Sequence, residues 1–135
     1  MAKISLGING FGRIGRLFYR AALKHTTFKE HFDIVAVNDL TDTKTLAYLT
    51  KYDSIHGRMD ADVTYGQDYI KVAGNQIKVL SAKDPSTLPW KDMKVEYVLE
   101  STGFFTKLGD ASKHIAAGAR KVIISAPSEK DVPLL

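Results

Sequence analysis

The sequence predicts an α/β fold: a doubly wound, mostly parallel sheet that carries a small antiparallel β insertion. Three observations support this prediction. Short apolar runs alternate with amphipathic stretches, a glycine-rich turn joins the first run to the first amphipathic stretch, and the middle of the chain alternates in period two. Alternating strands and helices favour parallel strands that are joined by right-handed crossovers.

The first part of the chain is expected to form strand, helix, strand and helix in turn. The expected elements are a strand over residues 3–9, a helix over 12–24, a polar connection over 25–32 and a second strand over 33–38. A short helix follows and ends near Tyr52, with the hydroxyl of Thr41 or Thr43 as its expected N-cap.

From residue 53 to residue 83 the pattern changes to alternation of apolar and polar residues. Glycines separate three runs, over 63–65, 69–72 and 76–80, which is typical of antiparallel hairpins. The parallel pattern then returns with a strand over 95–99, a helix over 107–117 and a strand over 121–124. Four parallel strands result, with 76–80 as a candidate fifth, whereas a complete doubly wound dinucleotide domain has about six. The sequence therefore predicts one incomplete domain over 1–135, truncated on its C-terminal side.

With 135 residues, of which 44% are apolar and 25% charged, the chain has the composition of one globular domain. No apolar run approaches the ~18 residues that a membrane span needs, and no signal-peptide-like segment opens the chain. We therefore expect a cytoplasmic protein with no membrane partner. The net charge is +4, but lysine and arginine are scattered, which argues against a nucleic-acid partner.

The sequence offers no candidate catalytic or metal-binding residue. Cysteine is absent, which excludes disulfides, thiolate metal sites and a thiol nucleophile within these residues. The four histidines are interpreted as structural: His25 and His31 in the polar connection, His56 in a loop, and His114 on a solvated helix face. No spacing of histidine and carboxylate residues suggests a metal site.

The most informative motif is the glycine-rich turn Gly10-Phe11-Gly12-Arg13-Ile14-Gly15, which lies between the first strand and the first helix. In this context Gly10 permits the tight turn, Gly12 lets a pyrophosphate approach the backbone, and Gly15 lets the helix lie close to the sheet. The helix N-terminus offers N–H groups and the positive end of its dipole to phosphates. The motif therefore favours dinucleotide binding.

Asp39, which directly follows the second strand, supports the same interpretation. Its carboxylate would accept hydrogen bonds from a ribose diol and repel a 2′-phosphate, which favours NAD over NADP. The alternative is a glycine turn that serves packing only, with Asp39 a solvated strand-end residue. Parallel strands present their carboxyl ends at one edge, and small or polar residues follow four of them: Asn9-Gly10, Asn38-Asp39, Ser101-Thr102-Gly103 and Ser125-Ala126-Pro127.

Five blocks of sequence resemble the phosphorylating glyceraldehyde-3-phosphate dehydrogenase family, in the order and spacing of that family. They are Ile8-Asn9-Gly10-Phe11-Gly12-Arg13-Ile14-Gly15-Arg16, Val37-Asn38-Asp39-Leu40, Lys51-Tyr52-Asp53-Ser54-Ile55-His56-Gly57, Glu100-Ser101-Thr102-Gly103-Phe104-Phe105 and Val122-Ile123-Ile124-Ser125-Ala126-Pro127. The resemblance covers essentially the whole chain. It implies a Rossmann-type NAD-binding domain.

The resemblance also implies a role for each residue of the cofactor site. Arg13 and Ile14 would donate backbone N–H groups to the pyrophosphate, while Asn9, Gly10, Gly12 and Gly15 shape the loop. Asp39 would hold the adenosine ribose, and Lys83, at a position that is often arginine, would lie near the adenine. Thr102, Gly103 and Phe105 would line the adenine and ribose side, and Ser125 would contact the cofactor toward its nicotinamide half.

For the intact protein, the resemblance implies oxidation and phosphorylation of glyceraldehyde 3-phosphate in glycolysis, by a cytoplasmic homotetramer that takes a small phosphorylated aldehyde. The family's cysteine nucleophile lies in a Ser-x-Cys-Thr-Thr-Asn block beyond the last strand here, so this chain, without the catalytic domain, would be inactive alone. Two alternatives remain open: a segment of erythrose-4-phosphate dehydrogenase, which tends to carry glutamate at the position of Asp39, and a stand-alone NAD-binding module.

Overall fold

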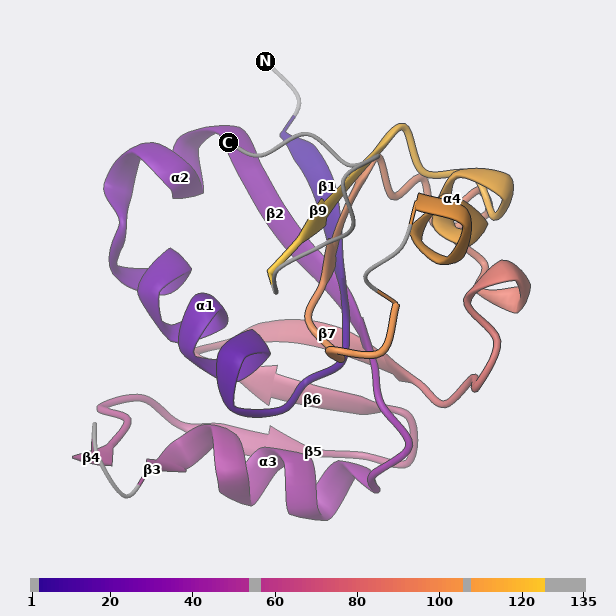
Figure 1. The fold of residues 1–135 in the computed structure, drawn as a ribbon. Helices are drawn as coiled ribbons and strands as arrows, with labels where there is room; N and C mark the ends of the chain where they lie inside the picture. Colours follow the sequence, from indigo (N-terminus) through magenta and orange to yellow (C-terminus); the bar gives the residue numbers. More distant parts are fainter. Residues whose placement is uncertain (1–2, 54–56, 106–107, 126–135) are drawn as a thin grey trace.

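The computed structural model describes residues 3–53, 57–105 and 108–125, and its main feature is a seven-stranded, mostly parallel sheet (Figure 1). The spatial order of its strands is β5-β6-β7-β2-β1-β8-β9, and β3 and β4 form a separate two-stranded sheet. The predicted α/β, Rossmann-type fold class is confirmed.

The elements of the first half are β1 (Ile4–Asn9), α1 (Arg13–Lys24), α2 (Thr26–His31), β2 (Phe32–Asn38), α3 (Thr43–Lys51), β3 (Tyr52–Asp53) and β4 (Gly57–Arg58). Those of the second half are β5 (Val63–Tyr65), β6 (Tyr69–Val72), β7 (Asn75–Leu80), a 3₁₀ turn (Pro85–Thr87), β8 (Tyr97–Glu100), α4 (Leu108–Ala116) and β9 (Lys121–Ile124). Most sequence-predicted bounds agree with these to within two residues.

Five neighbouring strands, β7, β2, β1, β8 and β9, run parallel to one another. The chain builds outward from β1 to β2 and β7 on one side, then returns to β8 and β9 on the other, so the order of strands reverses between β1 and β8. In such sheets a ligand binds at the carboxyl ends of the strands beside this reversal. The topology therefore places a candidate site before any side chain is considered.

The antiparallel segment is continuous with the main sheet. β6 pairs with β5 and with β7 in antiparallel fashion, while β7 pairs on its other edge with β2 in parallel fashion. The candidate fifth parallel strand over 76–80 is therefore confirmed. This junction extends the parallel sheet by a hairpin instead of forming a separate subdomain.

Two local predictions are wrong. The polar connection over 25–32 contains helix α2, because Phe28 stacks on Phe32 with ring centroids 4.9 Å apart and so fixes the segment against β2. The N-cap of α3 is Asp42, not Thr41 or Thr43: its Oδ1 accepts the N–H of Thr45 at 2.7 Å. Aspartate is preferred to threonine at helix N-caps, and its negative charge is favourable at the positive end of the helix dipole.

Two apolar clusters cover the two faces of the sheet, and β2 contributes to both through neighbouring residues, Val37 to one and Ala36 to the other. Helix α1 lies on the first face and α4 on the second (Figure 1). Trp90, which is fully buried in the second cluster, packs so closely on β1 that a Cβ at Gly7 would lie 2.8 Å from its ring. None of the described helices has the length and apolar character that a membrane crossing requires.

Candidate nucleotide-binding site

A cleft of about 350 Å³ lies at the carboxyl ends of the parallel strands. The strand register brings Asn9, at the end of β1, opposite Asn38 of β2 and Glu100 of β8. The lining residues are Asn9, Gly10, Gly12, Asn38, Asp39, Leu40, Ala82, Lys83, Ser101, Thr102, Phe104 and Phe105. The volume lies in the range of small-molecule sites, about 300–1,000 Å³. A larger hollow of about 590 Å³ beside α1 and α2 contains none of the sequence-predicted site residues.

Seven of the twelve predicted cofactor-site residues line this cleft: Asn9, Gly10, Gly12, Asp39, Lys83, Thr102 and Phe105. The other five lie around it. Arg13 and Ile14 are exposed on the first turn of α1, Gly15 is buried beneath that turn, Gly103 is exposed on the loop after β8, and Ser125 is exposed beyond β9. The contacts of all twelve with the cofactor remain predictions.

The predicted set omitted five lining residues: Asn38, Leu40, Ala82, Ser101 and Phe104. All five adjoin a predicted site residue in sequence, and that adjacency is the signal that would have found them. Phe104 stands out because its side chain is 80% exposed, next to the cleft. An exposed aromatic ring at the rim of a cleft offers a flat apolar surface to a planar ligand.

The glycine-rich turn has the shape that its sequence predicts. Gly10 has φ +91°, and a Cβ there would lie 2.7 Å from the backbone nitrogen of Thr102. At Gly15 a Cβ would collide with the carbonyl oxygen of Gly10, so the turn closes tightly on the start of the helix. At Gly12, by contrast, a Cβ would meet nothing within 4 Å, which leaves the approach to the backbone open.

The N-terminus of α1 has no side-chain cap. Gly12 is the N-cap residue and cannot supply a side-chain hydrogen bond, and no acidic residue lies in the first turn. The first N–H groups of a helix need partners from outside the helix. Together with the helix dipole, these uncapped groups fit an anionic group such as a pyrophosphate.

Asp39 ties the end of β2 to the glycine-rich turn. Its Oδ2 accepts the N–H of Phe11 at 2.8 Å, and its Oδ1 accepts the N–H of Thr41 at 2.9 Å. Because each carboxylate oxygen accepts about two hydrogen bonds, each retains capacity for a ligand hydroxyl. Asp39 therefore shapes the turn as well as offering free acceptor capacity to the cleft, and this second role cannot be read from the local sequence.

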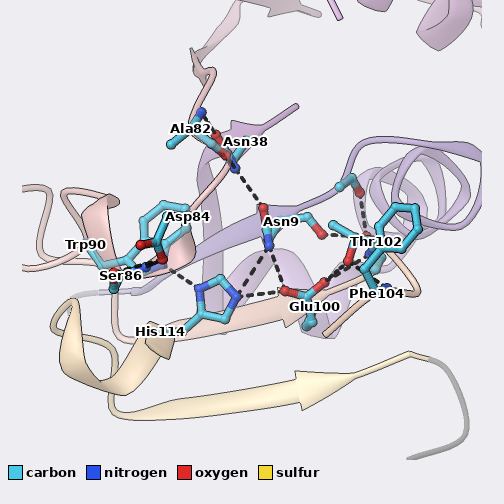
Figure 2. A network of polar contacts seen from close by, with 12 residues as sticks. Asn9, Asn38, Ala82, Asp84, Ser86, Trp90, Glu100, Thr102, Phe104 and His114 are labelled. Atoms are coloured by element: carbon cyan, nitrogen blue, oxygen red, sulfur yellow. Dashed lines mark hydrogen bonds and ion pairs between the residues drawn. The ribbon is translucent and has the colours of Figure 1, made fainter. Parts of the chain in front are cut away.

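A chain of hydrogen bonds runs under the floor of the cleft (Figure 2). The side chain of Asn38 is held by the backbone of Ala82. Oδ1 of Asn38 accepts the N–H of Ala82 at 2.8 Å, and Nδ2 of Asn38 donates to the carbonyl oxygen of Ala82 at 2.9 Å. The same Nδ2 donates to Oδ1 of Asn9 at 2.8 Å. Asn9 in turn donates from Nδ2 to Oε1 of Glu100 at 2.6 Å. These bonds link the ends of three neighbouring strands and fix the orientation of both amides.

Glu100 is a buried carboxylate, 1% exposed, that is fully satisfied by hydrogen bonds. Oε1 accepts from Asn9 and from Nε2 of His114 at 2.8 Å, and Oε2 accepts from the backbone N–H and the hydroxyl of Thr102 at 3.0 and 2.6 Å. Burial alone would raise the pKa of Glu100, but the hydrogen bonds from His114, Thr102 and Asn9 outweigh it and hold this pKa below its ordinary value.

The prediction for His114 is wrong. Its side chain is fully buried between Glu100 and Trp90, not on a solvated helix face. The indole N–H of Trp90 only donates, and it points at Nδ1 of His114 at 3.0 Å. Nδ1 must therefore be unprotonated, so Nε2 carries the proton and donates it to Glu100. His25 caps α2 through its ring nitrogen, whereas His56 lies outside the described residues.

Comparison with known proteins agrees with this geometry. The family described as "Glyceraldehyde 3-phosphate dehydrogenase, NAD binding domain" matches residues 4–108. Glyceraldehyde-3-phosphate dehydrogenase 1 of Bacillus cereus is 52% identical over 136 residues, which cover 100% of this chain and 39% of that protein. The glyceraldehyde-3-phosphate dehydrogenase of Geobacillus stearothermophilus is 53% identical over 128 residues, with 95% of this chain and 37% of that protein covered.

A third relative, the glyceraldehyde-3-phosphate dehydrogenase of Thermotoga maritima, is 50% identical over 129 residues, with 96% of this chain and 38% of that protein covered. The chain thus spans less than two fifths of the length of these curated relatives. The resemblance drawn from the five sequence blocks is confirmed. The chain belongs to the NAD-binding domain family of glyceraldehyde 3-phosphate dehydrogenase, and NAD is the cofactor of that family.

Proposed function

We propose that the cleft at the carboxyl ends of β1, β2 and β8 holds NAD, with its adenosine half between the residues after β7 and those after β8. The observation that carries this proposal is the convergence of three features on one cleft. An open glycine-rich turn, an uncapped helix N-terminus and a strand-end carboxylate meet where the strand order reverses.

Each residue then has a role that its position supports. Backbone N–H groups at Arg13 and Ile14 bind the pyrophosphate, because they lie on the uncapped first turn beside the open Gly12. The carboxylate of Asp39 accepts hydrogen bonds from the ribose of the adenosine. It also repels a 2′-phosphate, so NAD binds more tightly than NADP.

The walls of the cleft receive the adenine. Lys83 lies on the wall that follows β7, and Thr102 and Phe105 lie on the wall that follows β8. Gly103, with φ +80°, gives the loop its turn beside Thr102. Ser125 follows β9, at the same edge of the sheet, and faces the nicotinamide half of the cofactor.

The intact protein, we infer, is the glycolytic enzyme that oxidises and phosphorylates glyceraldehyde 3-phosphate. The nicotinamide ring supplies the hydride acceptor when NAD is bound, and this domain positions it. No cysteine occurs in these 135 residues, so the thiol nucleophile and the binding of the aldehyde belong to the rest of the enzyme. Residues 1–135 form the NAD-binding domain without the catalytic domain, and the cytoplasmic location and the homotetramer stay predictions.

Calorimetric titration of the purified chain with NAD tests the cofactor site. We expect saturable binding that is weaker for NADP and weaker for Asp39→Ala. Asp92→Ala, which removes an exposed carboxylate that does not line the cleft, is the matched control and should bind as the wild type does. A folded wild-type chain that binds no NAD, or that binds NADP equally well, would contradict the proposed site.

A further inference from the structure

The hydrogen-bonded chain beneath the cleft joins one wall of the site to the other. It begins at Ala82, after β7, and ends at Thr102, after β8, and both residues line the cleft. Asn9, which forms the floor between them, receives one hydrogen bond from Asn38 and donates one to Glu100. Movement of any member would therefore be transmitted to residues that line the cleft.

Three members of this network, Glu100, His114 and Trp90, do not line the cleft. Glu100 and His114 are each almost completely buried, and neither is among the lining residues of the cleft within the described chain. His114 comes from α4, on the far side of β8, and is held by Trp90 from the loop that precedes β8. Figure 2 shows Trp90, His114 and Glu100 following one another across the view, with Asn9 joined to Glu100.

The donors and acceptors around Glu100 follow from the chemistry of the groups; the 3.4 Å contact between Nδ2 of Asn9 and Nε2 of His114 joins two donors and is not counted among these bonds. Trp90 can only donate, so His114 accepts at Nδ1 and donates from Nε2 to Glu100. The carboxylate of Glu100 receives four hydrogen bonds, about its full capacity, from two residues of the cleft and from His114. A fully satisfied network of this kind admits one arrangement, because a single reversed or missing donor leaves a buried charge under-compensated.

We propose that Glu100, held by His114 and Trp90, is the positioning residue of the NAD cleft. Glu100 holds the amide of Asn9 in the floor and the backbone and hydroxyl of Thr102 in the wall before the cofactor arrives. The hydroxyl of Thr102 then accepts the N–H of Phe104 at 3.1 Å, so the same carboxylate orders the loop that carries the exposed ring. A site that is already ordered loses less conformational freedom on binding, which increases affinity. The inference rests on the proposed binding of NAD.

Calorimetric titration with NAD of the full chain and of four variants tests the positioning role. Glu100→Gln replaces two acceptor sites by donors, and His114→Leu removes the donor to Glu100. Each should weaken NAD binding about tenfold, the equilibrium factor of one lost buried hydrogen bond. His114→Gln retains a donor toward Glu100 and should stay within about threefold of the wild type.

The matched control is Thr50→Val in α3. The hydroxyl of Thr50 is fully buried and donates to the carbonyl of Leu46 at 2.6 Å, so the variant also loses one buried hydrogen bond, away from the cleft. It should lose stability and keep the NAD affinity of the wild type. All affinities are measured where urea titration shows each protein to be folded.

Two spectroscopic measurements do not depend on NAD. In the wild type, ¹⁵N shifts should show an unprotonated Nδ1 and a protonated Nε2 on His114. The amide of Thr102 should be protected from hydrogen exchange in the wild type and in Thr50→Val, and should lose at least about tenfold of its protection in Glu100→Gln and His114→Leu.

The outcomes separate this inference from the proposed function. If the wild type binds NAD and the folded Glu100→Gln and His114→Leu variants bind it equally well, the positioning role is overturned while NAD binding stands. If the wild type binds no NAD, the proposed function fails, and positioning is decided by the exchange of Thr102 alone. If Glu100→Gln does not fold, the two His114 variants decide. If no variant at either position folds, the network is a requirement for folding and the inference is overturned.

Discussion

Three glycine-to-alanine substitutions should separate the reasons why this chain uses glycine. Gly10 has φ +91° and backbone atoms close to where a Cβ would lie. Gly74, in the hairpin between β6 and β7, has φ +85° but open space around it. Gly12 has φ −77° and open space as well. An alanine would therefore meet backbone strain and close contacts at Gly10, backbone strain alone at Gly74, and neither at Gly12.

The expected costs follow from these geometries. A positive φ costs an alanine about 1 to 2 kcal/mol, and this should be the whole effect of Gly74→Ala. At Gly10 the new methyl group would also lie 2.7 Å from the nitrogen of Thr102, which adds the penalty of overpacking, about 1 to 3 kcal/mol. Gly10→Ala should therefore lose about 2 to 5 kcal/mol of unfolding free energy. Gly12→Ala should lose less than about 1 kcal/mol.

Urea denaturation followed by far-UV circular dichroism measures these differences, and calorimetry with NAD adds a second axis. Gly12→Ala should leave the protein stable and still weaken NAD binding, because its methyl group occupies the approach of the pyrophosphate. Gly74→Ala should lower the stability and bind NAD as the wild type does. If Gly10→Ala loses no more unfolding free energy than Gly74→Ala, the inference that the turn packs closely against Thr102 is wrong. If Gly12→Ala binds NAD normally, the pyrophosphate does not pass there.

Three further predictions concern carboxylates. Asp39→Asn exchanges one charge-assisted acceptor for a donor. It should lower the unfolding free energy measured in urea by about 1 to 2 kcal/mol and reduce the preference for NAD over NADP measured by calorimetry. If neither value changes, the dual role of Asp39 is contradicted. The pKa of Glu100 is lower in the folded chain than in the unfolded one, so its stabilisation is complete above the unfolded value, about pH 4.3, and is lost as the pH falls through the folded pKa. The difference in unfolding free energy between the wild type and Glu100→Gln should therefore shrink from pH 7 to pH 3, and a constant difference would contradict the assigned shift. Asp42→Ala should lower the melting temperature measured by circular dichroism, whereas Thr41→Ala should not, and the reverse result would assign the cap of α3 to threonine.

The local signals of the sequence located the main parts of the site. Gly10, Gly12 and Asp39 were predicted because the chemistry of a strand-to-helix turn, and of the residue after a strand, depends on neighbours in the chain. The cofactor followed from the same residues. From sequence alone the fifth parallel strand, over 76–80, is only a candidate, because period-two alternation does not reveal on which edge, or in which direction, a strand pairs.

The network behind the cleft was missed because its members are far apart in the chain. Asn9 and Glu100 are separated by 91 positions, and Trp90 and His114 by 24. A histidine on a short helix has the same local sequence whether its face is solvated or buried. Its burial is decided by what surrounds it in the fold, here Glu100 at the end of β8 and Trp90 in the preceding loop.

The class of fold, the glycine-rich turn, the strand-end carboxylate and the family can be predicted from the amino-acid sequence, since each depends on short segments whose chemistry is local. Two features appear only in the folded chain: Asp39 also closes the turn through Phe11, and Glu100 and His114 support the cleft from below. The physical reason is that a buried charge is stable only where donors from distant segments converge on it. That convergence exists only after the strands have aligned and α4 has packed on the sheet.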